Sequence, residues 1–106
     1  CFTAGPRELR LLLDFGAWVS FTGVVTFANA KETREAARIA PRDRVMVETD
    51  APFLTPEPHR KVRPNEPRFV AHVADALADL WGRPRDLVRD ELGANARRFF
   101  GVAPRA

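Results

Sequence analysis

The chain has 106 residues, 45% of them hydrophobic, and a formal net charge of +3. This length suits one small domain and is too short for two, and the apolar fraction excludes intrinsic disorder. Because no apolar run approaches the ~18–20 residues that cross a bilayer, we expect no transmembrane helix and no role at a membrane. We also expect no signal peptide. The basic balance permits an anionic partner without demonstrating one.

Cys1 is both the first residue and the single cysteine. It therefore excludes an internal disulfide and a metal site made of cysteines alone. A single thiol favours a reducing compartment, and we expect a cytoplasmic protein. Because the sequence opens on Cys1 and not on Met, we expect it to be a fragment of a longer chain.

The first elements alternate between helical and extended patterns. Pro6 suits the first turn of a helix, and Gly16 predicts where that helix ends. Bulky apolar residues predict a buried strand at residues 18–22. A second helix is predicted at residues 30–40, with Asn29 as its N-cap in a capping box.

A second buried strand is predicted at residues 45–47, running on to Asp50. Residues 51–64 form a proline-rich loop. Asn65 then caps a long helix that ends at Gly82. Gly93 is predicted to break the remainder into two helices, at residues 84–92 and 94–100.

Strands that alternate with helices predict a parallel α/β fold with crossover helices. Both strands are apolar on both faces, as a covered parallel strand requires. Two strands alone do not make a stable sheet. We therefore expect the missing strands of a larger sheet or barrel to lie upstream.

Asp50 follows the second strand at its C-terminal end, where α/β folds carry their working residues. Alternation places Glu48 and Asp50 on one face. A carboxylate there can bind a divalent cation and can orient or deprotonate an attacking water. An Asp before Ala-Pro can instead cap the next turn. Strand position alone leaves both interpretations open.

One carboxylate does not hold a metal, since catalytic zinc sites need about three protein ligands. His72 lies beside the apolar stripe of the long helix, and we interpret it as a boundary histidine. His59, in the proline-rich loop, is a candidate for substrate contact, with a solvated histidine as the alternative. The remaining ligands are expected outside this chain.

The run VMVETDAP at residues 45–52, followed by PHRKVRPNEP at residues 58–67, resembles the TatD family of metal-dependent deoxyribonucleases. Three further segments resemble that family in the same order: CFTAG at the start, SFTGVVTFANA at residues 20–30 and NARRFFGV at residues 95–102.

TatD-like proteins are TIM-type (β/α)8 barrels with a dinuclear metal site. The resemblance implies that residues 1–106 are the C-terminal part of such a barrel, with strands seven and eight and four to five helices. Asp50 matches the family's eighth-strand aspartate, a metal ligand that also orients the attacking water. The other ligands, histidines and a glutamate from earlier strands, are implied outside the chain. Two divalent ions are implied, and Mg, Mn and Zn are not distinguished.

Arg60 matches the family's loop arginine, and an arginine near such a metal can hold a non-bridging phosphate oxygen. His59 is its neighbour. Asn65 matches the asparagine of the NEP motif and either contacts substrate or fixes the loop. The loop reads HRKVRPNEP where the family usually has HRGKRNEP, so no role is carried over to Lys61 or Arg63.

The leading hypothesis is a metal-dependent phosphodiesterase, a DNase that removes nucleotides from DNA ends and works as a monomer. A second hypothesis keeps the barrel and its metals but assigns an amide or another ester, because fold does not fix function. A third is that the isolated chain is an inactive truncated fragment that lacks most metal ligands. A nucleic-acid-binding module is disfavoured, since no aromatic stripe alternates with the basic residues.

Overall fold

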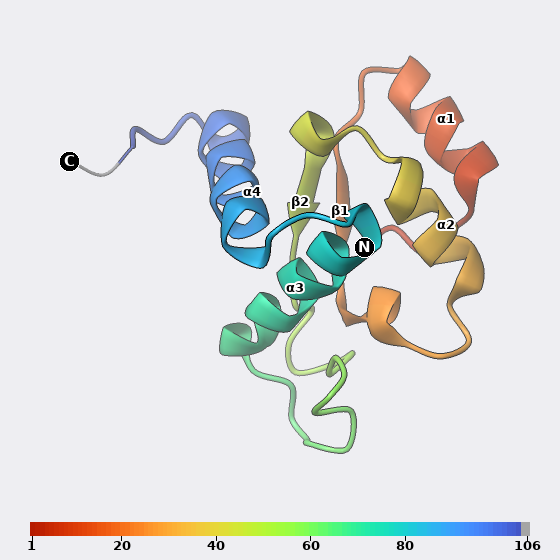
Figure 1. Ribbon diagram of the computed structural model, residues 1–106, viewed down its shortest axis with the longest axis vertical. Coiled ribbons are helices and arrows are strands. Elements are labelled where there is room, and N and C mark those ends of the chain that lie inside the picture. The colour runs from red at the N-terminus through yellow and green to blue at the C-terminus, as the bar shows by residue number, and fades with distance from the viewer. Residues whose placement is uncertain (105–106) are drawn as a thin grey trace.

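Helices and two short strands alternate along residues 1–104, the part of the chain that the computed structural model describes (Figure 1). The regular elements are α1 (Pro6–Asp14), β1 (Val19–Phe21), α2 (Lys31–Ile39), β2 (Val45–Val47), α3 (Val70–Trp81) and α4 (Arg85–Phe100). Three 3-10 turns join them: η1 (Gly23–Thr26), η2 (Arg42–Arg44) and η3 (Pro67–Phe69).

Strands β1 and β2 pair in parallel, with Val19 opposite Val45 and Phe21 opposite Val47. Helix α2 forms the crossover between them, as the alternating pattern predicts. The N–H of Glu48 donates to the carbonyl of Phe21 at 3.0 Å, which extends the pairing past the end of β2. The two expected parallel strands are therefore confirmed, although β1 is shorter than the predicted strand at residues 18–22.

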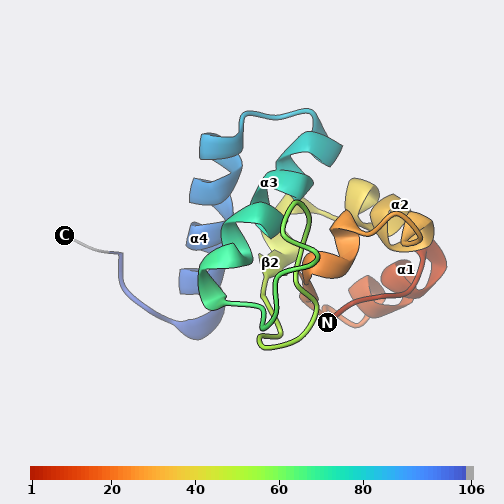
Figure 2. The same ribbon diagram turned by 90° about the horizontal axis from the view of Figure 1, so that it is seen from below.

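The hydrophobic core lies between the sheet and the helices. Val19, Phe21 and Val45 are buried, while the intervening Ser20 and Met46 are only half-buried. The helices contribute Leu9, Ala36, Ala37, Val73, Leu77, Val88 and Leu92 to the core. In Figure 2 the helices form an arc around the strands, so they cover one face of the sheet. Alternation places Ser20, Met46 and Glu48 on the opposite face.

The predicted capping box at the start of α2 is wrong. The helix begins at Lys31 with Ala30 as its N-cap, and no side chain caps it. Asn29 therefore stands one residue too early for its side chain to reach the first free N–H groups of the helix. The helix is anchored differently, since the hydroxyl of Thr33 donates to the carbonyl of Thr3 at 2.9 Å.

The predicted break at Gly93 is also wrong, because α4 runs without interruption from Arg85 to Phe100. A glycine inside a helix costs only about 1 kcal/mol relative to alanine. Buried contacts on both sides outweigh this cost: Leu92 is in the core, and the buried Asn95 amide donates to the carbonyls of Arg42 and Val45 at 2.6 and 2.8 Å.

The long helix was predicted to begin after Asn65, but α3 begins at Val70, behind the 3-10 turn η3. Two other predicted helix ends are confirmed. Pro6 occupies the first turn of α1, and Gly82 ends α3 in the left-handed conformation with φ 61°. Among residues 1–104, no helix has both the length and the apolar character needed to cross a membrane.

Candidate active site

Asp50 lies just beyond the C-terminal end of β2, in a sharp turn. Its backbone has φ 57°, in the left-handed region that a non-glycine residue seldom adopts. The turn is closed by neighbouring groups: the Thr49 hydroxyl accepts from the N–H of Ala51 at 3.2 Å, and the N–H of Phe53 donates to the carbonyl of Asp50 at 2.9 Å. Such backbone strain is concentrated at functional sites.

The carboxylate of Asp50 is exposed, and within the described part of the chain it has neither a hydrogen bond nor an ion pair. The alternative that this side chain caps the next turn therefore has no support, because the side chain of Thr49 does so. The turn presents Asp50 with both carboxylate oxygens free to bind a ligand.

The side chain of Asn65 stabilises this turn by hydrogen bonds to its backbone. Only 3% of Asn65 is exposed, and its side-chain amide donates to the carbonyls of Thr49 and Phe53 at 2.9 and 2.7 Å. These two carbonyls flank Asp50 in the chain. The predicted helix cap is wrong, because Glu66 is the N-cap of η3 and donates its own N–H to the Asn65 side-chain oxygen at 2.9 Å.

All the polar atoms of the Asn65 side chain are thus used inside the loop. Its proposed contact with substrate remains a prediction that this placement does not support. The position supports the other role predicted from the sequence, which is to fix the loop.

Glu48 precedes Asp50 by two residues in the chain and is half-buried. Its carboxylate lies 3.6 Å from the backbone nitrogen of Cys1, and the sulfur of Cys1 lies 3.1 Å from the hydroxyl of Thr22. Phe2 also donates its N–H to the carbonyl of Ser20 at 2.8 Å. The segment before α1 therefore reaches the same end of the sheet as Glu48.

The side chains at this end of the sheet can supply some of the ligands that a divalent cation needs, but not all of them. Asp50 offers a hard, unpaired carboxylate of the kind that Mg²⁺, Mn²⁺ and Zn²⁺ accept. No group of three or more His, Cys, Asp or Glu residues that could hold a metal occurs among residues 1–104. Asp50 could supply one ligand to such an ion, and a complete metal centre would need further ligands from outside residues 1–104.

The proline-rich loop packs directly on the end of β1 at Gly23. A Cβ at Gly23 would lie 2.4 Å from the carbonyl oxygen of Leu54 and 3.0 Å from the Cα of Pro56, so only glycine permits this approach. The hydroxyl of Thr26 also accepts from the N–H of Glu57 at 2.9 Å. The sequence contains the Thr-Gly pair after the strand, but nothing local in it indicates this long-range contact.

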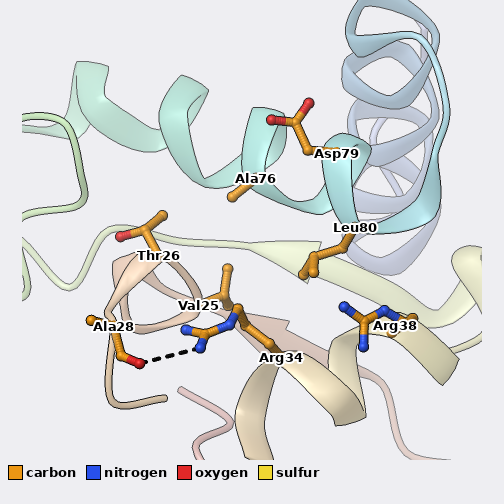
Figure 3. Close-up of a pocket in the computed structure, with 8 residues that line it drawn as sticks. All are labelled: Val25, Thr26, Ala28, Arg34, Arg38, Ala76, Asp79 and Leu80. Atoms are coloured by element: carbon orange, nitrogen blue, oxygen red, sulfur yellow. Dashed lines mark hydrogen bonds between the residues drawn. The ribbon is translucent and has the colours of Figure 1, made fainter. Parts of the chain in front are cut away.

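Arg60 extends from this loop onto an aromatic ring. Its guanidinium carbon lies 3.7 Å from the ring centre of Phe27, a cation–π contact that fixes the group while leaving its N–H donors available. Arg34 in turn donates to the carbonyl of Phe27. It also donates to the carbonyl of Ala28, as Figure 3 shows. The backbone that carries the ring beneath Arg60 is therefore itself held in place.

A cavity of about 470 Å³ lies beside Arg34, between α2, η1 and α3 (Figure 3). Arg38, Asp79 and Leu80 also line it, and none of the predicted site residues does. A second cavity, of about 640 Å³, is open to solvent and is lined by residues of the proline-rich loop, Arg60 among them. The residues that line the second cavity belong to the loop that directly follows Asp50 in the chain.

His59 packs in a separate cluster. Its ring stacks on Phe69 with 4.7 Å between centres and 12° between planes, and meets His72 edge-on, also at 4.7 Å. Burial lowers the pKa of His72, and the charge of His59 lowers it further. The interpretation of His72 as a boundary histidine agrees with its half-buried position. A substrate contact by His59 stays a prediction.

Comparison with known proteins identifies the family. The family model described as TatD related DNase matches residues 1–101. The uncharacterised metal-dependent hydrolase YcfH of Escherichia coli K12 is 49% identical over 102 residues, which cover 96% of this chain and 38% of YcfH. The protein named 3'-5' ssDNA/RNA exonuclease TatD from Rahnella sp. is 38% identical over 110 residues, covering 99% of this chain and 41% of that protein.

The crystal structure of YJJV, a TatD homologue from Escherichia coli K12, superimposes with a TM-score of 0.86 at 25% identity. The match covers 96% of this chain and 39% of that one. The fold is therefore that of part of a TIM-type (β/α)8 barrel, and the chain spans about two fifths of the length of the curated relatives it matches. The chain belongs to the TatD-related DNase family.

Proposed function

We propose that this chain, in a protein of its relatives' full length, acts as a metal-dependent phosphodiesterase on nucleic acid strands, with DNA as the main substrate. "Full-length enzyme" below means a protein in which residues 1–106 replace the matching 102-residue segment of YcfH. The observation that carries the proposal is the exposed, unpaired carboxylate of Asp50, held in a left-handed turn at a strand end.

Support for a nucleic acid substrate comes from two sources. The Rahnella relative is named as a ssDNA/RNA exonuclease. The loop that follows Asp50 is basic, with Arg60, Lys61 and Arg63 close together in the chain and no acidic residue among those lining its cavity. A positive loop beside a metal ligand suits a substrate whose backbone is anionic.

The residues of this chain would divide the work as follows. Divalent ions, when bound, supply Lewis-acid stabilisation of the phosphate and activation of water. The carboxylate of Asp50 would hold an ion and would orient the attacking water by accepting a hydrogen bond from it. Arg60, fixed on Phe27, donates to a non-bridging phosphate oxygen. The buried amide of Asn65 keeps the turn that presents Asp50 in place.

The test is Asp50→Ala and Asp50→Asn in the full-length enzyme. Hydrolysis of a single-stranded oligonucleotide with added Mg²⁺, Mn²⁺ or Zn²⁺ should fall on the order of 10³-fold or more, as for other residues that act directly in catalysis. Calorimetric titration should show weaker metal binding, while the melting temperature stays within a few degrees.

Asp90→Asn is the matched control, since Asp90 is exposed on α4 and lies outside the strand-end region. It should leave hydrolysis and metal binding unchanged. Full activity of Asp50→Ala would refute the assignment of Asp50. If the unaltered full-length enzyme hydrolyses amides or carboxylic esters but no oligonucleotide, the substrate class is wrong.

A further inference from the structure

The cavity of about 640 Å³ in the proline-rich loop is lined by an aromatic ring and by arginines. The folding of the loop does not itself require side chains of these kinds there. The size of the cavity lies within the range of roughly 300–1,000 Å³ that small-ligand sites occupy. Two arms of the loop form its walls: one carries Phe53, and the other carries Arg60 and Arg63. The cavity thus combines one aromatic ring with two cations.

Phe53 is fixed in its backbone and free in its side chain. Its N–H donates to the carbonyl of Asp50 at 2.9 Å, and its carbonyl accepts from the amide of Asn65 at 2.7 Å. Its side chain is nevertheless among the exposed ones, at 66%, and within the described residues it stacks on no other aromatic ring. A large apolar ring held outward on a rigid backbone is a preorganised surface for stacking.

The charges around the ring favour an anion. Arg60 and Arg63 line the cavity, and no Asp or Glu does. Arg60 is already oriented by the Phe27 ring, so less conformational freedom is lost when it binds a phosphate. Lys61 lies between the two arginines in the chain but does not line the cavity.

We propose that this cavity is a nucleotide subsite, in which Phe53 stacks on an unpaired base while Arg60 and Arg63 hold a phosphate of the same strand. The proposal rests on the proposed phosphodiesterase function. Because the amide of Phe53 is bonded to the carbonyl of Asp50, a base on this ring sets the distance of the neighbouring phosphodiester from the Asp50 carboxylate. A base can stack here only when it is unpaired, which selects single-stranded ends.

The first experiment compares Phe53→Leu with Phe53→Tyr in the full-length enzyme. Leucine keeps an apolar side chain but cannot stack, whereas tyrosine can. The substrates are short single-stranded oligonucleotides that are either intact or abasic at one position, with the abasic position moved along the strand. Steady-state hydrolysis gives kcat and KM for each pair.

With the intact strand, Phe53→Leu should raise KM between about 5-fold and 100-fold, the range for loss of one stacked base. Phe53→Tyr should retain the original KM. At one abasic position the unaltered enzyme should itself show the raised KM, and Phe53→Leu should add nothing further. Unchanged kcat would show that the turn of Asp50 is intact.

A KM rise of equal size on every abasic strand, or no rise at all, would overturn the subsite while hydrolysis by the unaltered enzyme upholds the proposed function. A fall in kcat on all strands would also overturn it, since the ring would then act through the Asp50 turn. Absence of hydrolysis by the unaltered enzyme would refute the proposed function instead.

The second experiment compares Arg63→Ala with Lys61→Ala, two losses of one positive charge in the same loop. Arg63→Ala should weaken binding and reduce the slope of log KM against log salt concentration by about 1, as loss of one phosphate contact predicts. Lys61→Ala should change both quantities less. Equal effects would show a diffuse basic surface and would contradict a built subsite.

Discussion

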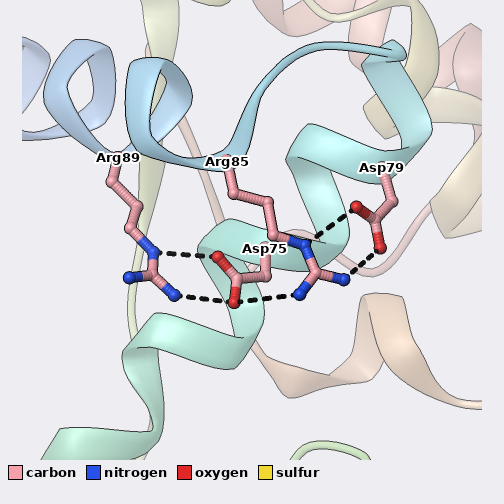
Figure 4. Close-up of polar contacts among 4 residues, drawn as sticks. All are labelled: Asp75, Asp79, Arg85 and Arg89. Atoms are coloured by element: carbon pink, nitrogen blue, oxygen red, sulfur yellow. Dashed lines mark hydrogen bonds and ion pairs between the residues drawn. The ribbon is translucent and has the colours of Figure 1, made fainter.

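Two aspartates in this chain occupy opposite environments. Asp75, on α3, is 14% exposed and accepts two bonds from Arg89, at 2.8 and 2.7 Å, with Arg85 3.7 Å away (Figure 4). Asp50, at the strand end, is exposed and has no such partner in the described residues. The same side chain is fully paired in one place and left unpaired in the other.

The network around Asp75 is complete by itself. Arg85 also bonds to Asp79, at 3.1 and 2.9 Å, and this hydrogen bond lowers the pKa of Asp79. The carboxylates likewise raise the pKa of Arg85 and of Arg89. Four charges thus neutralise one another across the α3–α4 contact, which is a structural use of carboxylates.

The strand-end turn shows the reverse arrangement. Its backbone is strained at Asp50, and its carbonyls are bonded to a buried amide, while its carboxylate is bonded to nothing in residues 1–104. This combination of a fixed backbone and an unpaired charge supports the proposal that Asp50 binds a ligand. An unpaired charge on a fixed backbone therefore distinguishes Asp50, the proposed metal ligand, from the paired carboxylates of Asp75 and Asp79.

The largest effect should come from Asn65→Ala in the full-length enzyme. The carbonyls of Thr49 and Phe53 lose their donor, so the free energy of unfolding should fall by about 1–3 kcal/mol in urea titrations. Metal affinity and kcat should fall as well, because the turn that presents Asp50 is released.

Asn95→Ala provides a matched control. Asn95 is equally buried, at 4% exposure, and its amide likewise donates to two backbone carbonyls. It should destabilise the enzyme by a similar amount and leave the kcat of the folded fraction unchanged. If Asn65→Ala also spares kcat and metal affinity, Asn65 does not position Asp50.

A smaller effect on melting temperature and hydrolysis is expected to differ between Asp75→Asn and Asp50→Asn. Asp75→Asn weakens a largely exposed ion-pair network and should lower the melting temperature by about 1–3 °C without altering hydrolysis. Asp50→Asn should do the opposite: it should stop hydrolysis without lowering the melting temperature, since asparagine tolerates the left-handed conformation at least as well. Equal thermal losses in the two variants would contradict the contrast between the two sites.

The smallest effect should be the pH dependence of the histidine cluster. Burial and the charge of His59 lower the pKa of His72 below its usual 6.5, with Arg85 and Arg89 acting in the same direction and Asp75 opposing them. The unfolded chain therefore takes up this proton at higher pH than the folded one. The stability contribution is present above pH 6.5 and is lost as pH falls through the folded-state pKa.

Urea unfolding at pH 7.5 and 5.5 measures this contribution. The decline in unfolding free energy on acidification should be smaller in His72→Gln than in the unaltered full-length enzyme. An identical decline in both proteins would show that His72 takes no part in it.

The sequence predicted what depends on local pattern. Short runs of bulky apolar residues located both strands, and Pro6 and Gly82 marked helix ends correctly. The position of Asp50 after a strand was equally visible. Local pattern failed where a tertiary contact decides: Gly93 stays helical because α4 is buried on both sides of it.

The candidate site shows the same difference between features that follow from local pattern and features that depend on tertiary contacts. Asn65 looked like a helix cap because the residues after it suit a first turn, yet its amide bonds backward to the turn of Asp50. Arg60 was identified by family resemblance, but its cation–π contact with Phe27 joins segments that are distant in the chain. Such pairings depend on the folded path of the loop, which no local sequence pattern encodes.

Gly23 has a consequence for how this loop can vary. It has an ordinary backbone conformation, so it would pass for a replaceable small residue, yet the loop leaves no space for a methyl group there. The loop is thus clamped at Leu54–Pro56 on one side and at Asn65 on the other. Substitutions at the exposed Lys61, between these two anchors, should alter the charge of the loop while the turn of Asp50 remains undisturbed.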